Sequence, residues 1–221
     1  LGPDGSLYIA DFYNRIIGHY EVPLKHPGRD RERGRIWKLT YKGAPGRAAT
    51  GHGLPDFSEM DSPEIISELG HANITRRMLA THFIADHGDQ EIVKRIRRLW
   101  NRNELTTWRQ RIQCLWVMHR MGLVNQGILG DAVHDETMEV RTHAMHLLAE
   151  RKDWNAEQRN WVLLALQDNH PNVQRAAANA LSLHPRESHV LPLLKTRENP
   201  PADDPQWLHG MRLALRNQLY E

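Results

Sequence analysis

The sequence predicts a mainly α-helical protein, a solenoid of about five stacked helical hairpins preceded by a short two-stranded β segment. Three observations predict this fold. Residues 1–42 contain runs with the period of two that is typical of strands. Residues 62–221 instead place apolar residues at helical spacing, and this pattern recurs about every 33 residues. Residues 46–61, between the two parts, are rich in Gly, Ala and Pro, which is the composition of a linker.

Two strands are expected within residues 1–45. The sequence Pro3-Asp4-Gly5 is typical of a turn, because proline presets φ and glycine accepts a positive φ. Residues 7–10 form a short apolar run, and residues 35–41 alternate polar with apolar side chains. The intervening stretch holds two prolines and alternating charges, so we expect a long charged surface loop there.

The helical part is self-similar. Positions zero, four, seven and eight of the repeat lie on one face of a helix, and they are apolar in nearly every unit. The starting positions are separated by 33, 32, 33 and 34 residues, and they are Thr75, Trp108, Val140, Val173 and Trp207. Small residues stand where two helices must approach closely, at Ala144, Ala177, Ala180 and Ala214.

A second helical segment precedes each of these helices, which gives five hairpins. Ser62, Asn73 and Asn172 stand where N-cap residues are expected, and Pro63 suits a first helical turn. A single hairpin cannot bury the apolar faces of both its helices, so neighbouring hairpins must stack into a quasi-one-dimensional solenoid. The preceding segments are residues 63–69, 91–100, 126–133, 156–167 and 189–194.

Composition excludes several classes of site. The 29 Lys and Arg against 27 Asp and Glu give a net charge of +2, which offers no dense positive field for nucleic acid. The single cysteine, Cys114, excludes an internal disulfide framework, a Cys-rich zinc site and a CxxCH haem attachment within this chain. No apolar run approaches the ~20 residues that span a bilayer, so no membrane span is expected. The sequence begins with Leu1 and enters a turn and strand at once, so we expect a piece of a longer protein.

Two stretches resemble known families. The pattern apolar-Arg-x-x-Ala-x-x-Ala-Leu, clearest at residues 140–148 and 173–181, resembles a HEAT-type repeat and extends over residues 62–221. GPDGSLYIADFYN followed by GRIWKLTY resembles the last part of a six-bladed β-propeller of the sugar-dehydrogenase type. The segment GHYEVPLKHPGRDRERGRIWKL is similar to sequences of the membrane-bound dehydrogenase family of planctomycete-type bacteria. Residues 1–45 would then be a partial propeller blade with a charged loop, because two strands cannot make a propeller.

In that family a propeller is followed by HEAT-like repeats and a c-type cytochrome domain. The resemblance implies a non-catalytic scaffold that links a propeller oxidoreductase to an electron-accepting domain, in the periplasm or at a membrane. The parent protein would use c-type haem or pyrroloquinoline quinone, and no cofactor is expected in this chain. Two alternatives stay open: a free-standing HEAT-repeat module that binds a protein on its concave face, and a part of a sugar or alcohol dehydrogenase active unit. Whether the chain belongs to an enzyme also stays open, because analogy of fold does not establish chemistry.

The β segment offers four candidate residues. Asp11 and His19 follow the first strand, where propeller enzymes present loop residues to a substrate or cofactor. No base-nucleophile spacing is visible, which favours a capping role for Asp11. Arg31 and Arg33 belong to an arginine-rich loop that could chelate an anion. The interleaved acids favour ion pairs that hold the loop in place.

The repeat offers further candidates. Arg76, Arg109 and Arg141 share the second position of the first three units, and Arg175 lies one place later in the fourth unit. They could line a concave binding surface, although we favour a structural role toward an acidic partner or a carbonyl of the adjacent unit.

Histidine and cysteine candidates are weaker. His143 and His146, three residues apart on one helix, could face a metal ion, but no third ligand can be named. His82 and His119 have the scattered positions of surface or inter-helix residues, and Cys114 is expected to be a small buried thiol rather than a nucleophile.

The β segment should also expose apolar surface. Because the two strands lack the rest of a blade, we expect open strand edges and exposed side chains at Leu7, Ile9, Ile36 and Trp37. Deletion of residues 1–45 is expected to leave the helical circular dichroism and the melting temperature nearly unchanged.

Overall fold

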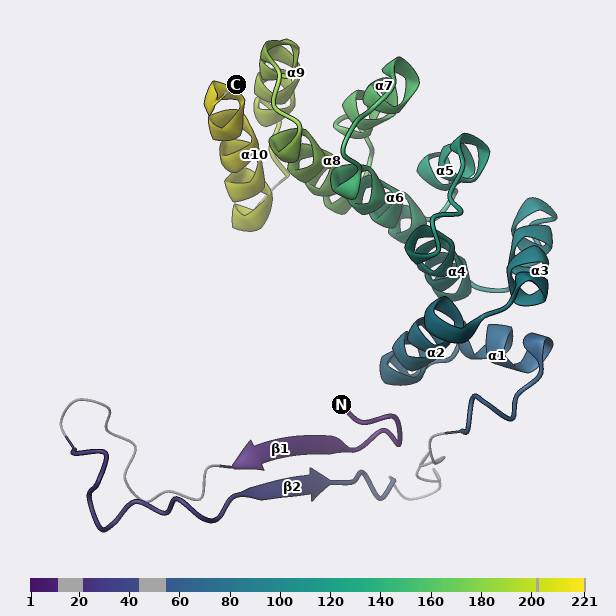
Figure 1. The fold of residues 1–221 in the computed structure, drawn as a ribbon. Coiled ribbons are helices and arrows are strands. Elements are labelled where there is room, and N and C mark those ends of the chain that lie inside the picture. Colours follow the sequence, from purple (N-terminus) through teal and green to yellow (C-terminus); the bar gives the residue numbers. More distant parts are fainter. Residues whose placement is uncertain (12–21, 44–54, 202, 221) are drawn as a thin grey trace.

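The computed structural model describes residues 1–11, 22–43, 55–201 and 203–220. The described residues form a mainly helical structure with one two-stranded antiparallel sheet (Figure 1). Both parts of the predicted secondary structure are therefore confirmed. The helices are α1 (Ser62–Glu68), α2 (Ile74–His87), α3 (Gln90–Asn101), α4 (Trp108–Arg120), α5 (Gln126–Val133), α6 (Met138–Glu150), α7 (Ala156–Ala165), α8 (Pro171–Leu183), α9 (Glu187–Arg197) and α10 (Pro205–Asn217), and the 3-10 helix η1 (Gln218–Tyr220) follows.

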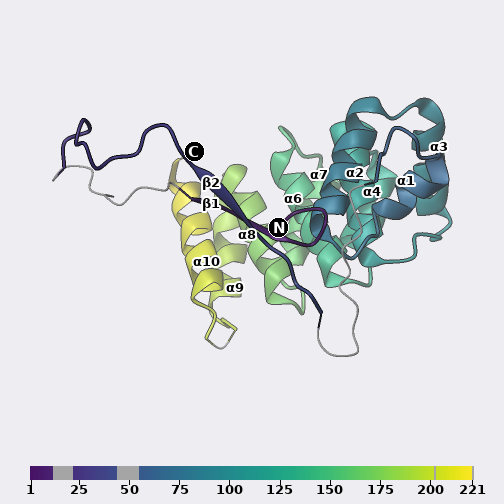
Figure 2. The ribbon, with the colours of Figure 1, turned by 90° about the horizontal axis from the view of Figure 1, so that it is seen from below.

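The helices lie in two curved layers. The even-numbered helices α2, α4, α6, α8 and α10 pack side by side, each against the next, along the inner side of an arc (Figure 1). The odd-numbered helices form the outer layer (Figure 1). In the view from below, the two strands cross in front of the helical part (Figure 2). Each predicted helical segment overlaps one of these helices, with ends that differ by three residues or fewer.

The hydrophobic core lies along the inner layer and between the layers. The close approach of α6 to α8 depends on small side chains, because Ala144, Ala177 and Ala180 have no exposed surface. Leu148 and Leu181 fill the space beside them and are also fully buried. The predicted use of alanine at helix contacts is confirmed at these positions.

The repeat register differs from the predicted one in the first two units. The residue seven positions after the N-cap is fully buried in every even-numbered helix, and these residues are Ala80, Cys114, Ala144, Ala177 and Met211. The equivalents of Val140 are consequently Arg76 and Gln110 rather than Thr75 and Trp108, and His82, seven residues after Thr75, is exposed.

Polar side chains caused this error. In the first two units a polar residue occupies the buried position three residues after the N-cap, where later units have Val or Trp. Arg76 donates to the Glu68 carboxylate at 2.9 and 2.6 Å, and Gln110 Nε2 donates to the Ile66 carbonyl at 3.0 Å. Because these contacts satisfy the buried polar groups, an apolar pattern is not needed there.

Two predicted N-caps also move. The cap of α1 is Asp61 rather than Ser62, since Asp61 and Glu64 each accept the other's backbone N–H, at 2.8 and 3.0 Å. The cap of α8 is His170 rather than Asn172, because Pro171 already occupies the first helical turn. Asn73 caps α2 as predicted, and its Oδ1 accepts the Thr75 N–H at 2.8 Å.

Strands β1 (Leu7–Asp11) and β2 (Arg35–Leu39) form an antiparallel hairpin in which Ile9 lies opposite Trp37. The predicted exposure of its apolar side chains is confirmed. The exposed fractions are 47% for Leu7, 43% for Ile9, 73% for Ile36 and 51% for Trp37.

The segment before β1 contacts the helical part at the start of α2. Asn73 donates through Nδ2 to the carbonyls of Gly2 and Pro3, both at 3.2 Å, and Thr75 Oγ1 donates to the Leu1 carbonyl at 2.9 Å. The same Asn73 side chain thus caps a helix with its oxygen and holds residues 2 and 3 with its nitrogen.

Candidate interaction surface

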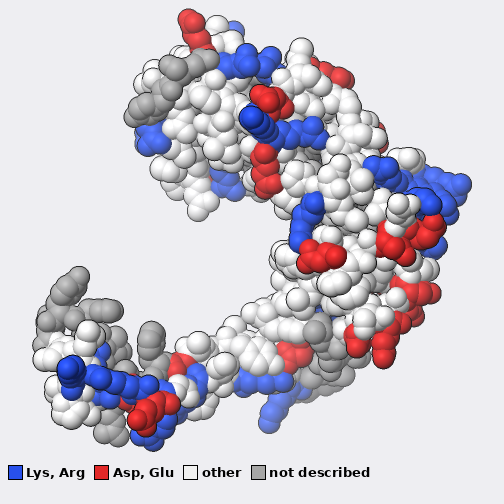
Figure 3. Space-filling view, in the orientation of Figure 1, with Lys and Arg blue, Asp and Glu red and all other residues white. Residues whose placement is uncertain are grey.

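The even-numbered helices carry a stripe of side chains that the neighbouring helices leave at least partly exposed. We call this stripe the inner face; it consists of the residues five and nine positions after the N-caps that are not fully buried. Figure 3 shows that the molecule curves around an open hollow bordered by both basic and acidic side chains. The inner-face residues are Met78, His82, Trp116, Thr142, His146, Arg175, Asn179, His209 and Leu213.

A cavity of about 290 Å³ opens on the inner face between α6, α8 and α10. None of the residues that the structure places around it is Asp or Glu. Its polar walls come from Thr142, His146, Asn172, Arg175, Asn179, Ser182, Gln206 and His209. Such a wall can donate and accept hydrogen bonds to a ligand that enters between the helices.

Arg175 supplies a guanidinium to the described residues around this cavity. Its Nη1 donates to Gln206 Oε1 at 3.0 Å, and its Nη2 donates to Asn172 Oδ1 at 3.3 Å. Both acceptors are neutral amides, and within the described part of the chain Arg175 forms no ion pair.

The lack of a side chain at Gly210 lets the Arg175 side chain lie close to α10. A Cβ atom at position 210 would lie 3.3 Å from Arg175 Cγ and 3.9 Å from Cδ. Glycine inside a helix costs about 1 kcal/mol relative to alanine. The close crossing of the arginine stem over α10 is a physical reason for glycine at this position.

Of the two candidate metal ligands, His146 lines the cavity, and His143 lies three residues before it on α6. Their ring centroids are 5.7 Å apart, and Trp116 Nε1 donates to His143 Nδ1 at 2.9 Å. Burial lowers the pKa of His143 to about 4, and the adjacent His146 adds to this effect. Burial likewise lowers the pKa of His146. In the described ranges, no cluster of three or more His, Cys, Asp or Glu side chains is placed to hold a metal ion.

Toward α2 and α4 the charges near the inner face are paired. Arg120 donates to Asp86 at 2.7 Å and lies 2.6 Å from His82 Nδ1. His119 Nε2 lies 2.9 Å from Glu150 Oε2. His82 and His119, which the sequence left scattered, therefore belong to polar contacts between neighbouring even-numbered helices.

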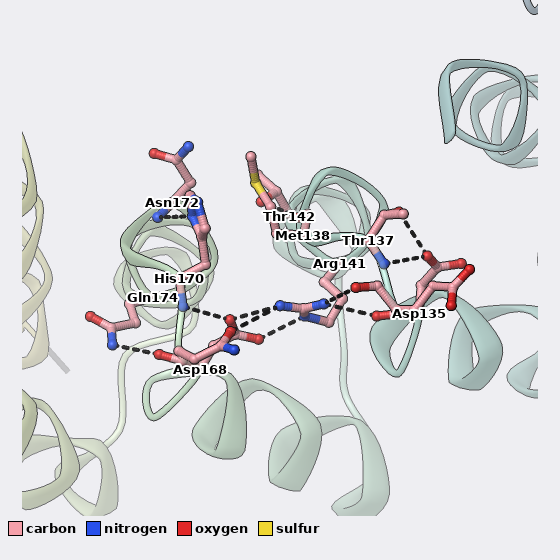
Figure 4. A network of polar contacts seen from close by, with 11 residues as sticks. Asp135, Thr137, Met138, Arg141, Thr142, Asp168, His170, Asn172 and Gln174 are labelled. Atoms are coloured by element: carbon pink, nitrogen blue, oxygen red, sulfur yellow. Dashed lines mark hydrogen bonds and ion pairs between the residues drawn. The ribbon is translucent and has the colours of Figure 1, made fainter. Parts of the chain in front are cut away.

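A second polar feature runs along the turns that lead into the even-numbered helices. Arg141 donates through Nε and Nη2 to the Asp168 carboxylate at 2.7 and 2.9 Å, and through Nη1 to the Asp135 carbonyl at 2.9 Å (Figure 4). One unit earlier, Arg111 Nε donates to Asp135 Oδ2 at 2.8 Å. We call these contacts the arginine ladder, because each arginine joins its own hairpin to the turn of the next hairpin.

The acids of the arginine ladder also order the turns. Asp135 Oδ1 accepts the Thr137 N–H at 2.9 Å, and Asp168 Oδ1 accepts the His170 N–H at 2.8 Å. Burial acts to raise the pKa of Asp168, but the hydrogen bonds from Arg141 and from the His170 backbone outweigh it and lower that pKa. The hydrogen bond to Asp168 in turn raises the pKa of Arg141.

The four repeat arginines chosen from the sequence do not share one environment. Arg76 pairs with Glu68 inside the first hairpin, at 2.9 and 2.6 Å. The Arg109 guanidinium lies over the Trp108 ring, 4.4 Å from its centroid. Counted from the N-caps, the equivalents of Arg141 are Arg77 and Arg111, and Arg111 had no place in the predicted alignment. Repeat spacing missed it because the intervals between equivalent positions are unequal.

The candidates in the β segment make local contacts. Asp11 Oδ2 accepts the Trp37 indole N–H at 3.0 Å and lies 3.6 Å from Arg35 Nε. Arg33 pairs with Asp30 at 2.9 Å, and Arg31 donates to the Leu24 carbonyl. His19 lies outside the described residues.

Cys114 is fully buried in α4. Burial raises the pKa of its thiol to about 12, although nearby Arg111 opposes the shift. A thiol with this pKa carries almost no thiolate at neutral pH and is a poor nucleophile.

A family model described as a domain of unknown function (DUF7133) matches residues 1–43. No curated protein matches the chain. Among the helices that the structure describes, none has the length and apolar character needed to cross a bilayer.

Proposed function

We propose that residues 62–221 form a HEAT-type solenoid that serves as a non-catalytic scaffold and binds a partner segment on its inner face. The two-layered arrangement and the contacts of each even-numbered helix with the next support the solenoid. The strongest support for binding is the inner face itself, since it combines curvature, partly exposed polar side chains and a cavity between α6, α8 and α10.

We further propose that this scaffold belongs to a larger protein of the membrane-bound dehydrogenase type. The likeness of residues 1–45 to part of a propeller blade supports this proposal, as does the exposed apolar surface of the β hairpin. The solenoid would hold a propeller oxidoreductase and a cytochrome-like domain at a fixed separation, in the periplasm or at a membrane. Haem or pyrroloquinoline quinone would be carried by those other domains. This role depends on the spacing of helices rather than on acid-base chemistry.

A peptide-display experiment tests the scaffold proposal. A library of random dodecapeptides is selected against the full chain, and the selected peptides are measured against two variants. Asn179→Trp places a bulky ring on the inner face, whereas Asn160→Trp makes the same change at an exposed position of α7 in the outer layer. We expect the selected peptides to lose affinity for Asn179→Trp and to keep it for Asn160→Trp. Equal affinity for both variants would contradict binding on the inner face.

A further inference from the structure

We propose that the cavity between α6, α8 and α10 binds the carboxylate of an Asp or Glu side chain within an extended peptide segment of a partner. This inference rests on the proposed function, because it names the chemistry that the inner face recognises. Arg175 would donate to that carboxylate, with Asn172 and Gln206 as flanking groups.

The first support is the state of Arg175 compared with similar arginines. Arg111 and Arg141 each bind an aspartate of the next turn. Arg175 lies one place later in its helix, five residues after the N-cap rather than four, and is half-buried; in the described part of the chain its guanidinium donates to two neutral amide oxygens. A guanidinium presents five donors in a planar fork that matches a carboxylate, so Arg175 has capacity for an anion that the described residues do not supply.

The second support is the charge around the cavity. Its lining contains Arg175 as a fixed positive charge, the imidazoles of His146 and His209, and no acidic residue in the described part of the chain. Burial lowers the pKa of His146; the charge of Glu150 opposes this shift and the charge of Arg175 adds to it. One fixed positive charge complements one carboxylate, whereas a phosphate dianion would call for a second cation.

The lining chemistry favours a side-chain carboxylate over the C-terminus of a peptide. A terminal carboxylate is commonly captured by a nest of free backbone N–H groups. Here the walls are side chains from helices whose backbone N–H groups are largely used within the helices. Asn172 and Gln206 turn their oxygens toward Arg175, which leaves their NH₂ groups available to donate to the ligand.

Gly210 supports the same assignment from the opposite wall. The missing side chain at position 210 lets the Arg175 stem lie against α10, with Cγ 3.3 Å from where a Cβ would stand. The guanidinium is thereby held at the boundary of α8 and α10, where a ligand entering the cavity meets it. A preorganised side chain loses less conformational entropy when it binds.

The test uses peptides selected on the full chain from a library with acetylated and amidated ends. We expect Asp or Glu to be enriched over Asn and Gln at one position. The best peptide is then synthesised in three forms, with Glu, Gln or phosphoserine at that position, and dissociation constants are measured by fluorescence anisotropy. We expect the Gln form to bind at least about tenfold more weakly, and the phosphoserine form to bind no better than the Glu form.

Four variants test the assignment of the carboxylate to Arg175. Arg175→Gln should weaken the Glu peptide by about tenfold or more and leave the Gln peptide unchanged. Arg197→Gln, at an exposed arginine of α9, removes the same charge outside the cavity and should change neither. Asn179→Glu places an acid one helical turn from Arg175 and should compete with the peptide without loss of helical signal, whereas Asn160→Glu should not compete.

The outcomes separate this inference from the proposed function. The carboxylate assignment is overturned if peptides bind the inner face without a preference for Asp or Glu, or if their affinity is unchanged by Arg175→Gln and Asn179→Glu. Either outcome leaves the scaffold proposal in place. Tighter binding of the phosphoserine form overturns the carboxylate assignment as well. A library that yields no peptide sensitive to Asn179→Trp counts against both proposals.

Discussion

Arg141 on α6 donates two hydrogen bonds, from Nε at 2.7 Å and from Nη2 at 2.9 Å, to the carboxylate of Asp168, which lies three residues before α8. The two side chains are only 15% and 12% exposed, so water screens the pair weakly. The same carboxylate accepts the His170 N–H at the start of α8. One aspartate therefore links two hairpins and orders the turn between the helices of the second.

We expect Asp168→Asn to lower the free energy of unfolding by about 2 kcal/mol, because it leaves a poorly solvated guanidinium without its anion. Urea denaturation followed by circular dichroism at 222 nm measures this loss. Asp153→Asn, at an exposed aspartate of the α6–α7 connection, is the control and should change the unfolding free energy by less than about 0.5 kcal/mol. Equal midpoints for both variants would contradict a stabilising role of the pair.

The corrected register makes a separate prediction for two arginines of α4. Arg111→Gln should cost about 2 kcal/mol, because Arg111 binds Asp135, whose side chain is only 4% exposed. Arg109→Gln should cost less than about 1 kcal/mol, since Arg109 offers a cation-π contact to Trp108. Thermal or urea unfolding of the two variants side by side tests the order. If Arg109→Gln were the more damaging change, the alignment predicted from the sequence would be the better one.

Acid should destabilise the α4–α6 contact through His143. Its pKa is lowered from 6.5 to about 4 in the folded chain, so its contribution to stability is complete above about pH 6.5 and is lost as the pH falls toward 4. On the order of 1–2 kcal/mol should disappear between pH 7.5 and pH 5. His143→Gln keeps an acceptor for Trp116 and cannot titrate, so its urea midpoint should fall less over this range. An identical pH dependence in wild type and variant would show that His143 does not contribute.

Cys114 should report global unfolding. Its fully buried thiol, with a pKa of about 12, should not react with Ellman's reagent at pH 8 in the native chain. Reaction should begin only in urea concentrations that unfold the helices, with the same midpoint as the circular dichroism. Rapid labelling of the native chain would mean that α4 opens locally.

Two substitutions at Asn73 separate its two roles. Asn73→Asp keeps an oxygen to accept the Thr75 N–H but removes the donors to Gly2 and Pro3. It should leave the melting temperature within about 2 °C of the wild-type value and raise the rate of amide hydrogen exchange in residues 1–11. Asn73→Ala removes both functions and should also cost about 1 kcal/mol of stability. Unchanged exchange in Asn73→Asp would show that these hydrogen bonds do not hold the N-terminal segment.

The sequence located the helices well, because each one carries its own apolar stripe and its own stop signals. It located the caps less well, since Asp61 and Ser62 are both good cap residues and only the reciprocal bond with Glu64 decides between them. The register failed where Arg76 and Gln110 occupy positions that later units fill with Val140 or Val173. A buried polar side chain is acceptable only when its partner is present, and that partner lies in another helix.

The candidate site was harder to predict for a related reason. Arg175 was singled out from the sequence, but the absence of an ion pair and the contact with Gly210 depend on how α8 and α10 pack. Asn172, Asn179 and Gln206 carry no local signal of binding. Their places around the cavity become apparent only when residues are counted from the N-caps. The caps themselves were identified from the structure.

The succession of contacts along the even-numbered helices has a mechanical consequence. Each even-numbered helix contacts the next, from α2 through α4, α6 and α8 to α10, so the contacts are arranged in series. A load applied at α2 and α10 would be carried by every joint in turn, and small rotations at each joint would add into a large change of span. Arg111 and Arg141 bridge their joints by ion pairs, whereas α8 and α10 are joined by hydrogen bonds to amide oxygens, from Arg175 to Gln206 and from Trp207 to Gln174, so the load would pass between helices through different chemistry at each joint.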